Sequence, residues 1–165
     1  MDKQIILLNG PSSSGKSTLA KALQRWIKEQ GKGHYAVVSI DDFLKMSTGE
    51  TIYEDDVFEI SGNLCAKVLE ELASAAGVII DHVITSERIY CQLVEGVGHY
   101  LICKVQVTCP LAVLRKREAE RRNRCIGSAE ASYTYLFPKT GYDLTVDTSA
   151  MPPEACAMQI YNLFE

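Results

Sequence analysis

The stretch LNGPSSSGKSTLA, Leu8 to Ala20, contains the spacing G-x-x-x-x-G-K-[ST] of a phosphate-binding loop. Gly10 and Gly15 let the chain turn so that successive backbone N–H groups point at one anion, and the dipole of the following helix adds to their effect. Lys16 can then reach the β- and γ-phosphates, and the Ser17 hydroxyl can ligate Mg²⁺. The sequence therefore predicts a site for the phosphates of a nucleoside triphosphate, formed by Gly10, Pro11, Ser12, Ser13, Ser14, Gly15, Lys16, Ser17 and Thr18.

The residues on either side of this loop predict a strand before it and a helix after it. The run QIILLN, Gln4 to Asn9, is short and apolar, as in a buried strand. After the loop, Leu19, Leu23 and Ile27 recur at helical spacing up to Gly31, which is a typical helix stop. This context favours a phosphate-binding loop over the alternative, a Ser/Gly-rich surface loop.

The same alternation of strand and helix continues along the chain. Further strands are predicted at 35–40, 78–80, 100–107 and 142–147, and further helices at 64–75, 86–95, 110–123 and 152–164. Because strands that alternate with crossover helices form parallel sheets, we expect a single α/β domain over residues 1–165, with a five-stranded, mainly parallel sheet flanked by helices. The last strand has apolar residues on one face only, as at an edge or an exposed side. Ligands bind at the carboxyl ends of such strands.

Three aspartates follow predicted strands and are expected on the same rim as the loop. Either Asp41 or Asp42 could accept a proton from an acceptor hydroxyl or steer Mg²⁺ while the other caps the next helix; the alternative is that both are caps. Asp81 ends an apolar run, the pattern of a Walker B carboxylate that holds the metal, and the alternative is a loop-capping aspartate. The metal ligands expected from the sequence are therefore Ser17 and Asp81.

A basic segment, LRKREAERRNRCIG from Leu114 to Gly127, stands out in an otherwise acidic protein. Its Arg117, Arg121 and Arg124 fall at i, i+4 and i+7, on one face of a helix. A solvated helix face is the simpler interpretation. We favour an arginine-bearing lid at about residues 115–137 that closes over the triphosphate, excludes water and neutralises the transferring phosphoryl group.

Composition limits the other possible classes of protein. The chain has 165 residues, 47% of them hydrophobic and 23% charged, as in one globular domain. It contains no apolar run of the roughly 20 residues that a membrane span needs and no secretory signal, which predicts a cytoplasmic protein without a membrane partner. A net charge of −4 and a pI near 5.4 argue against nucleic acid as a partner. The six cysteines lack zinc-site spacing and are expected to be buried free thiols.

The segments ILLNGPSSSGKST, SIDDFL, VIIDHV, REAERRNRCIG and YDLTVDTS…PPEACA follow one another in the order found in a known family. In this the chain resembles the chloramphenicol phosphotransferase-like P-loop kinases over nearly its whole length. The resemblance implies an adenylate-kinase-like fold and ATP-dependent, Mg²⁺-assisted phosphorylation of a hydroxyl on a small molecule. It implies Asp41 as the catalytic aspartate and Arg121 and Arg124 as lid arginines. The expected catalytic residues are therefore Asp41, Lys16, Arg121 and Arg124. Together with the helix spacing described above, Arg117 and Arg121 are expected to contact the nucleotide.

The chain departs from the family pattern at three positions. His82 stands where a second acid is expected after Asp81, and it is given no catalytic role. Phe137 replaces an expected lid-side histidine and Ser132 an expected glutamine. Contacts that those two groups make in relatives are therefore not expected in this chain.

Charge is the main guide to the acceptor. Residues 41–71 contain nine acids against two lysines and no arginine, and an acceptor that carries its own phosphate would need basic residues to bind it. The alternative is that most of these acids face solvent. We expect a neutral or cationic acceptor, either antibiotic-like or a metabolite, while a homo-oligomer remains compatible with the sequence. The rival functions are a nucleotide or nucleic-acid-end kinase, and a P-loop ATPase or regulatory nucleotide-binding module.

Overall fold

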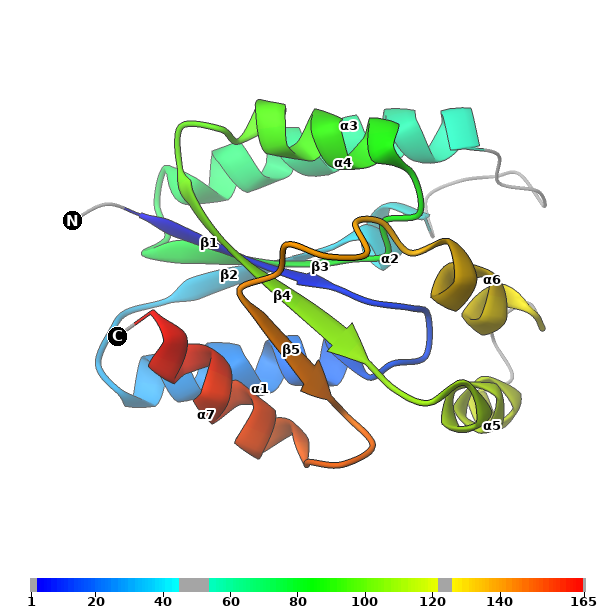
Figure 1. Cartoon of the computed structure of the whole chain (residues 1–165). Coiled ribbons are helices and arrows are strands. Elements are labelled where there is room, and N and C mark those ends of the chain that lie inside the picture. Colours follow the sequence, from blue (N-terminus) through cyan, green and yellow to red (C-terminus); the bar gives the residue numbers. More distant parts are fainter. Residues whose placement is uncertain (1–2, 45–53, 122–125, 165) are drawn as a thin grey trace.

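A five-stranded parallel sheet forms the centre of the protein (Figure 1). The computed structural model describes residues 3–44, 54–121 and 126–164. The strands are β1 (Gln4–Asn9), β2 (Tyr35–Ser39), β3 (Gly77–His82), β4 (Leu101–Thr108) and β5 (Leu144–Asp147), and their order in the sheet is β2-β3-β1-β4-β5. The predicted α/β fold with a five-stranded parallel sheet is confirmed, and β5 lies at an edge as its single apolar face indicated.

Helices cover both faces of this sheet. Helices α1 (Lys16–Glu29) and α7 (Pro153–Leu163) pack on one face, and α3 (Glu54–Leu72) and α4 (Glu87–Gly96) pack on the other (Figure 1). The short α2 (Ile40–Leu44) follows β2, whereas α5 (Leu111–Arg121) and α6 (Ser128–Tyr135) lie beyond the carboxyl ends of the strands. Three helices are therefore gathered at the end of the sheet where the phosphate-binding loop leaves β1.

The central strand β1 is apolar because both of its faces are buried. Ile6 and Leu8 belong to the core on the side of α1 and α7, while Ile5 and Leu7 belong to the core on the side of α3 and α4. All four side chains are at most 1% exposed, and burying each contributes about 1.5–3 kcal/mol. The end of β1 is thereby held in a fixed register between β3 and β4, where Leu8 lies beside Asp81.

The region after β2 differs from the sequence prediction. The strand ends at Ser39, and Asp41 and Asp42 lie in the first turn of α2 rather than at the end of the strand. The backbone N–H of Asp41 donates to Ser39 Oγ over 3.3 Å, a local contact that competes with continued strand pairing. Two carboxylates in the first turn of a helix are favoured by the helix dipole, so the local sequence supports the helix.

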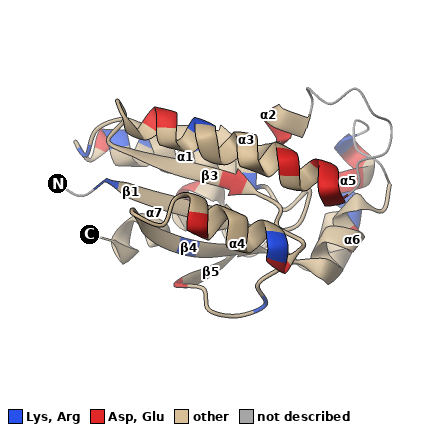
Figure 2. Ribbon diagram, turned by 90° about the horizontal axis from the view of Figure 1, so that it is seen from above, with Lys and Arg blue, Asp and Glu red and all other residues tan. Residues whose placement is uncertain are grey.

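Two further helical segments were not predicted from apolar spacing. Helix α3 begins at Glu54, well before the apolar repeat, with Glu54, Asp55 and Asp56 in its first turn (Figure 2). Helix α6 has no apolar repeat at all, since only Ala129 and Ser132 are buried in it. The start of α3 is favoured by acidic side chains near the positive end of the helix dipole. The position of α6 depends on contacts with other parts of the chain.

The cysteine prediction is correct for four residues and wrong for one. Cys65, Cys103, Cys109 and Cys156 are buried free thiols, and burial raises the pKa of the Cys103 thiol to about 11 with a smaller contribution from Asp143. Cys91 is exposed, because it lies two positions from both Ile89 and Leu93 on α4 and therefore on the side of the helix away from the core. Cys125 lies outside the described residues.

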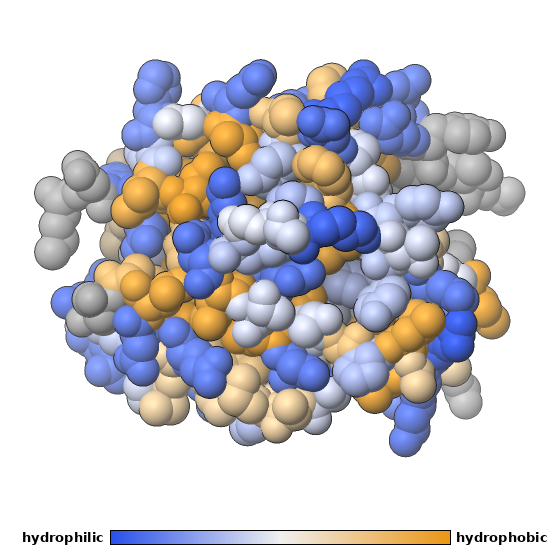
Figure 3. Space-filling model, viewed as in Figure 1, coloured by the Kyte–Doolittle hydropathy of each residue, from blue (hydrophilic) through white to orange (hydrophobic). Residues whose placement is uncertain are grey.

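The surface of the protein is mixed. On the face drawn in Figure 3, apolar side chains form small groups separated by polar ones. Among the described residues, no helix is both long enough and apolar enough to cross a membrane. Most of the large apolar side chains lie in the two layers between the sheet and its helices.

We predict that Leu64→Ala destabilises the protein far more than Leu69→Ala does. Both leucines lie on α3, but Leu64 is fully buried against the sheet whereas Leu69 is 42% exposed. A cavity at Leu64 should lower the free energy of unfolding by about 2–5 kcal/mol, against less than about 1 kcal/mol at Leu69. Urea denaturation followed by far-UV circular dichroism measures both, and equal losses would contradict the packing described above.

Candidate functional site

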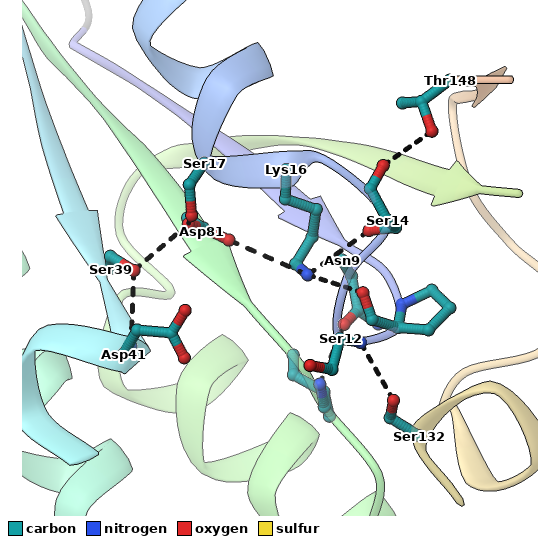
Figure 4. Close-up of polar contacts among 12 residues, drawn as sticks. Asn9, Ser12, Ser14, Lys16, Ser17, Ser39, Asp41, Asp81, Ser132 and Thr148 are labelled. Atoms are coloured by element: carbon teal, nitrogen blue, oxygen red, sulfur yellow. Dashed lines mark hydrogen bonds and ion pairs between the residues drawn. The ribbon is translucent and has the colours of Figure 1, made fainter. Parts of the chain in front are cut away.

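A pocket of about 480 Å³ opens at the carboxyl ends of the strands. It is lined by the P-loop (residues 10–17), by α2, by the residue after β3, by α5 and by the turn after β5. Figure 4 shows the P-loop, the start of α2 and Thr148 of the turn after β5. The lining residues are Ser12, Ser13, Gly15, Lys16, Ser17, Thr18, Asp41, Val83, Arg117, Glu120, Arg121, Thr148 and Pro153. Nine residues predicted from the sequence thus share one pocket, while Arg124 lies outside the described residues.

The P-loop turns tightly because glycine occupies two positions that other residues would strain. A Cβ at Gly10 would overlap the carbonyl oxygen of Val107, and Gly15 has φ of 85°, in the left-handed region. Ser13 also has a positive φ, 68°, which is uncommon for a residue with a Cβ. The turn delivers the chain into α1, which starts at Lys16 without a side-chain cap, so its first N–H groups are available to an anion.

Lys16 brings a positive charge into the floor of the pocket. Its side chain is 6% exposed, and Nζ donates to the carbonyl oxygen of Pro11 over 2.9 Å. Nζ also lies 3.5 Å from Ser14 Oγ and 4.0 Å from Asp81 Oδ1 (Figure 4). Pro11 and Ser14 do not line the pocket themselves, but they hold this ammonium group in place.

Asp81 accepts hydrogen bonds from two serine hydroxyl groups. Its Oδ2 accepts hydrogen bonds from Ser17 Oγ over 2.7 Å and from Ser39 Oγ over 3.1 Å (Figure 4). Ser39 in turn accepts from the backbone of Asp41, so the two aspartates are linked through one serine. Sequence reasoning missed Ser39, because a serine inside a strand carries no motif.

The pair Ser17 and Asp81 fits a magnesium ion that is bound mainly through other groups. Hydroxyl and carboxylate oxygens are the donors that Mg²⁺ prefers, and Mg²⁺ commonly takes only one or two protein ligands and fills its shell with water and substrate phosphate. No cluster of three or more His, Cys, Asp or Glu side chains suited to a metal occurs among the described residues. The donor set therefore suits Mg²⁺ carried with phosphates better than a closed metal cage.

Thr148 connects Arg117 to the P-loop and was not predicted. Arg117 donates from Nη1 to Thr148 Oγ1 over 3.1 Å and from Nη2 to Thr148 O over 3.2 Å. The Thr148 hydroxyl donates to the carbonyl oxygen of Ser14 over 2.6 Å (Figure 4). Thr148 lies in the YDLTVDTS segment. No local sequence pattern could reveal its contacts, because its partners lie far away along the chain. Arg121, one helical turn after Arg117, lines the same pocket.

Polar side chains also fix the segment after α6 against the end of β1. Asn9 is fully buried; its Nδ2 donates to Phe137 O and to the Tyr142 hydroxyl, each over 2.9 Å, and its Oδ1 accepts from the backbone of Ile84 over 2.9 Å. Phe137, where the resemblance led us to expect a histidine, packs its ring edge-on against Tyr90. Its contribution is therefore a backbone acceptor and a ring contact.

His82 lies behind the pocket. It is fully buried, and its Nε2 lies 3.2 Å from the Ser61 hydroxyl of α3. Burial, together with the nearby positive charge of Lys16, lowers the pKa of His82 to about 4. The imidazole is therefore neutral at neutral pH, and its position between β3 and α3 suits a structural role.

Comparison with known proteins gives concordant results. A sequence model of the family described as chloramphenicol phosphotransferase-like protein matches residues 3–165. An adenylyl-sulfate kinase of Enterobacter sp. (strain 638) is 30% identical over 115 residues, which are 69% of this chain and 57% of that kinase, so the match spans little more than half of the relative.

Two solved structures share the fold. The Mycobacterium tuberculosis APS kinase CysC in complex with AMPPNP and APS superposes with a TM-score of 0.78, at 17% identity, covering 99% of this chain and 98% of that one. A gluconokinase from Sinorhizobium meliloti 1021 superposes with a TM-score of 0.66, at 21% identity, covering 98% and 91%. The fold is thus that of P-loop kinases.

We predict that Thr148→Val weakens the site whereas Thr148→Ser preserves it. Valine keeps the shape of threonine but removes the hydroxyl that joins Arg117 to Ser14, leaving a buried carbonyl without its donor. The free energy of unfolding should fall by about 1–3 kcal/mol for Thr148→Val, and by less than about 1 kcal/mol for Thr148→Ser. Urea denaturation measures both; similar values for the two variants would mean that the hydroxyl contributes nothing.

Proposed function

The chain belongs to the chloramphenicol phosphotransferase-like protein family, and from this premise we propose that it transfers the γ-phosphoryl group of ATP to a hydroxyl group of a small molecule. The similar proteins named above are kinases, which supports a phosphotransferase. The observation that carries the proposal is that Lys16 and Asp41 line the same pocket. One supplies a charge for the phosphates and the other a base for the acceptor.

The nucleotide side of the proposed reaction uses α1 and α5. The N–H groups at the start of α1 and the ammonium of Lys16 would bind the phosphates, because this position combines a helix dipole with a buried cation. Arg117 and Arg121 would approach from α5 and neutralise charge that develops on the transferring group. We propose the segment of about 115–137, which contains most of α5 and all of α6, as a lid; Arg124, the further lid arginine suggested by the resemblance, lies outside the described residues.

Mg²⁺ would be held by the hydroxyl of Ser17 and by Asp81, directly or through water. When bound, the ion would neutralise negative charge on the phosphates. The hydrogen bond between Ser17 and Asp81 keeps the two oxygen groups 2.7 Å apart, close enough to serve one ion.

Asp41 is the proposed general base. As the bond between the γ-phosphorus and the bridging oxygen of ADP breaks, a new bond forms between that phosphorus and the acceptor oxygen, and the hydroxyl proton passes to the Asp41 carboxylate. The backbone bond to Ser39 fixes the start of α2, and Ser39 is held by Asp81, so the base is positioned relative to the proposed metal ligand.

We infer a neutral or cationic acceptor from the distribution of charge in the pocket. The cations among the described lining residues, Lys16, Arg117 and Arg121, all come from α1 and α5, on the nucleotide side. On the side of α2 the described lining residues are Asp41 and Val83. An anionic acceptor would normally need a basic partner there, and the described lining supplies none.

Part of the acidic surplus in residues 41–71 is compensated by Arg88, which lies outside that segment. Arg88 of α4 lies 2.6 Å from Asp55 Oδ1 and 3.7 Å from Glu54 Oε2, and Lys67 pairs with Glu70 and Glu71 near the end of α3. The inference about the acceptor therefore depends on the pocket lining and much less on the acids of α3 (Figure 2).

A second candidate function is phosphorylation of adenylyl sulfate. The observation that favours it is the similarity to a curated adenylyl-sulfate kinase, whose name gives an anionic acceptor. Kinases of nucleotides or of nucleic-acid ends, and nucleotide-binding modules without transfer, are the remaining rivals. These possibilities differ in the charge of the acceptor, so one set of assays separates them.

The test is ATP consumption with a panel of acceptors in the presence of Mg²⁺. The panel contains neutral alcohols such as chloramphenicol and simple sugars, cationic aminoglycosides, adenylyl sulfate, nucleoside monophosphates and a 5′-hydroxyl oligonucleotide, and Lys16→Ala protein gives the background. We expect phosphorylated product, identified by mass spectrometry, only with neutral or cationic alcohols. Product from adenylyl sulfate alone would establish the second candidate, and ATP hydrolysis without any phosphorylated acceptor would indicate an ATPase.

We predict that Asp41→Asn abolishes most phosphoryl transfer and that Asp42→Asn does not. Both residues lie in the first turn of α2, but Asp41 lines the pocket and Asp42 is exposed, which makes Asp42→Asn a matched control. Losing a positioned base should lower kcat about 10²- to 10⁴-fold. ATP affinity, measured by calorimetry, should change little in either variant, and an inactive Asp42→Asn beside an active Asp41→Asn would reverse the assignment.

A further inference from the structure

Helix α6 is held in place by α5 rather than by its own sequence. It is eight residues long, its N-cap residue Gly127 has φ of 100°, and it has no side-chain cap of its own. A small apolar cluster, separate from the two main cores, joins the two helices through Leu114 and Ala129. So short and polar a helix is unstable alone, and the residues that hold it determine where it lies.

The carboxylate of Glu118, on α5, makes a buried polar contact with the start of α6. This side chain is 5% exposed, and it accepts hydrogen bonds from the backbone N–H of Gly127 over 3.2 Å and of Ala129 over 2.9 Å. It therefore does for α6 what an N-cap residue does, but from another helix. Burying a carboxylate costs free energy unless hydrogen-bond donors compensate it. Here each of the two Glu118 oxygens accepts a hydrogen bond from a backbone N–H group.

Helix α6 in turn contacts the P-loop. Ser132, 6% exposed, accepts a hydrogen bond from the backbone N–H of Ser12 over 2.9 Å (Figure 4). The same hydroxyl lies 2.7 Å from Ser128 O, to which it donates, so its lone pairs are turned toward Ser12. The hydroxyl that reaches the P-loop is thus oriented by the first turn of α6, which Glu118 caps.

We propose that Glu118 is a positioning residue that acts through α6 on the P-loop. It ties α5, which carries Arg117 and Arg121 into the pocket, to the helix whose Ser132 binds Ser12. The arginines and the P-loop are thereby held at one spacing without Glu118 reaching the pocket. The effect of Glu118 on catalysis rests on the proposed phosphoryl transfer. The chain of contacts from Glu118 through α6 to the P-loop does not depend on that proposal.

The link can be measured in the free protein by hydrogen exchange of assigned backbone amides. In Ser132→Ala the Ser12 amide loses its acceptor, and its exchange should accelerate about tenfold. Glu118→Ala, which removes no atom near Ser12, should accelerate the same amide by a similar factor. The double variant should be no faster than either single variant, because both changes break one chain of contacts.

Two controls separate this link from general loosening. Arg115→Met removes an exposed ion pair with Glu130 that also joins α5 to α6, and it should leave Ser12 exchange within about twofold of wild type, since such pairs stabilise little. The Ile79 amide, in the middle of β3, should keep its wild-type rate in every variant that retains the fold. If Glu118→Ala fails to fold, Glu118→Gln takes its place, since it keeps one acceptor oxygen and should give a smaller acceleration at Ser12.

The proposal would be overturned if the Ser12 amide exchanged at its wild-type rate in Glu118→Ala, or in Glu118→Gln where only that variant folds. It would also be overturned if the accelerations of the two single variants multiplied in the double variant. Where phosphoryl transfer is measurable, Glu118→Ala and Ser132→Ala should lower kcat by similar, non-multiplicative factors and leave the KM for ATP within about threefold. Failure to find any acceptor would count against the proposed function only, because the exchange rates decide the link between Glu118 and the P-loop by themselves.

Discussion

The buried positive charge of Lys16 is the feature around which the end of the sheet is organised. An ammonium group at 6% exposure needs compensation, and it receives it from the Pro11 carbonyl and from Asp81. Asp81 is set beside Leu8 by the register of β3 on β1, so the position of the counter-charge follows from packing in the sheet. Asp81 then binds Ser17 and Ser39, which extends the arrangement to α1 and to the start of α2.

The fold was predictable because its main signals are local. A strand buried on both faces is a continuous apolar run, and the P-loop follows such a run directly, so Gln4–Asn9 and Lys16–Glu29 could be assigned without long-range information. Asp41 was expected in the site and is there, although on a helix rather than at a strand end. That difference arises because a single backbone contact to Ser39, invisible to apolar spacing, ends the strand.

The residues that sequence reasoning missed share one property, which is that their partners lie far along the chain. Asn9 binds Phe137, Thr148 binds Ser14, and Ser132 binds Ser12. A lone serine, threonine or asparagine has no spacing to recognise, and its role depends on which distant backbone atom the fold brings near it. Helix α6 was missed for the same reason, because its cap belongs to another helix.

The short edge strand β5 bears on how the protein behaves at high concentration. An exposed sheet edge offers unpaired N–H and C=O groups to the strands of other molecules, and proteins commonly limit this risk by keeping edge strands short. With only four residues, Leu144–Asp147, β5 offers little main chain to an incoming strand, and its last residue, Asp147, carries a carboxylate. The edge formed by β5 is therefore poorly suited to nucleating aggregation, so a sheet whose central strand β1 is largely apolar can end there without recruiting further chains.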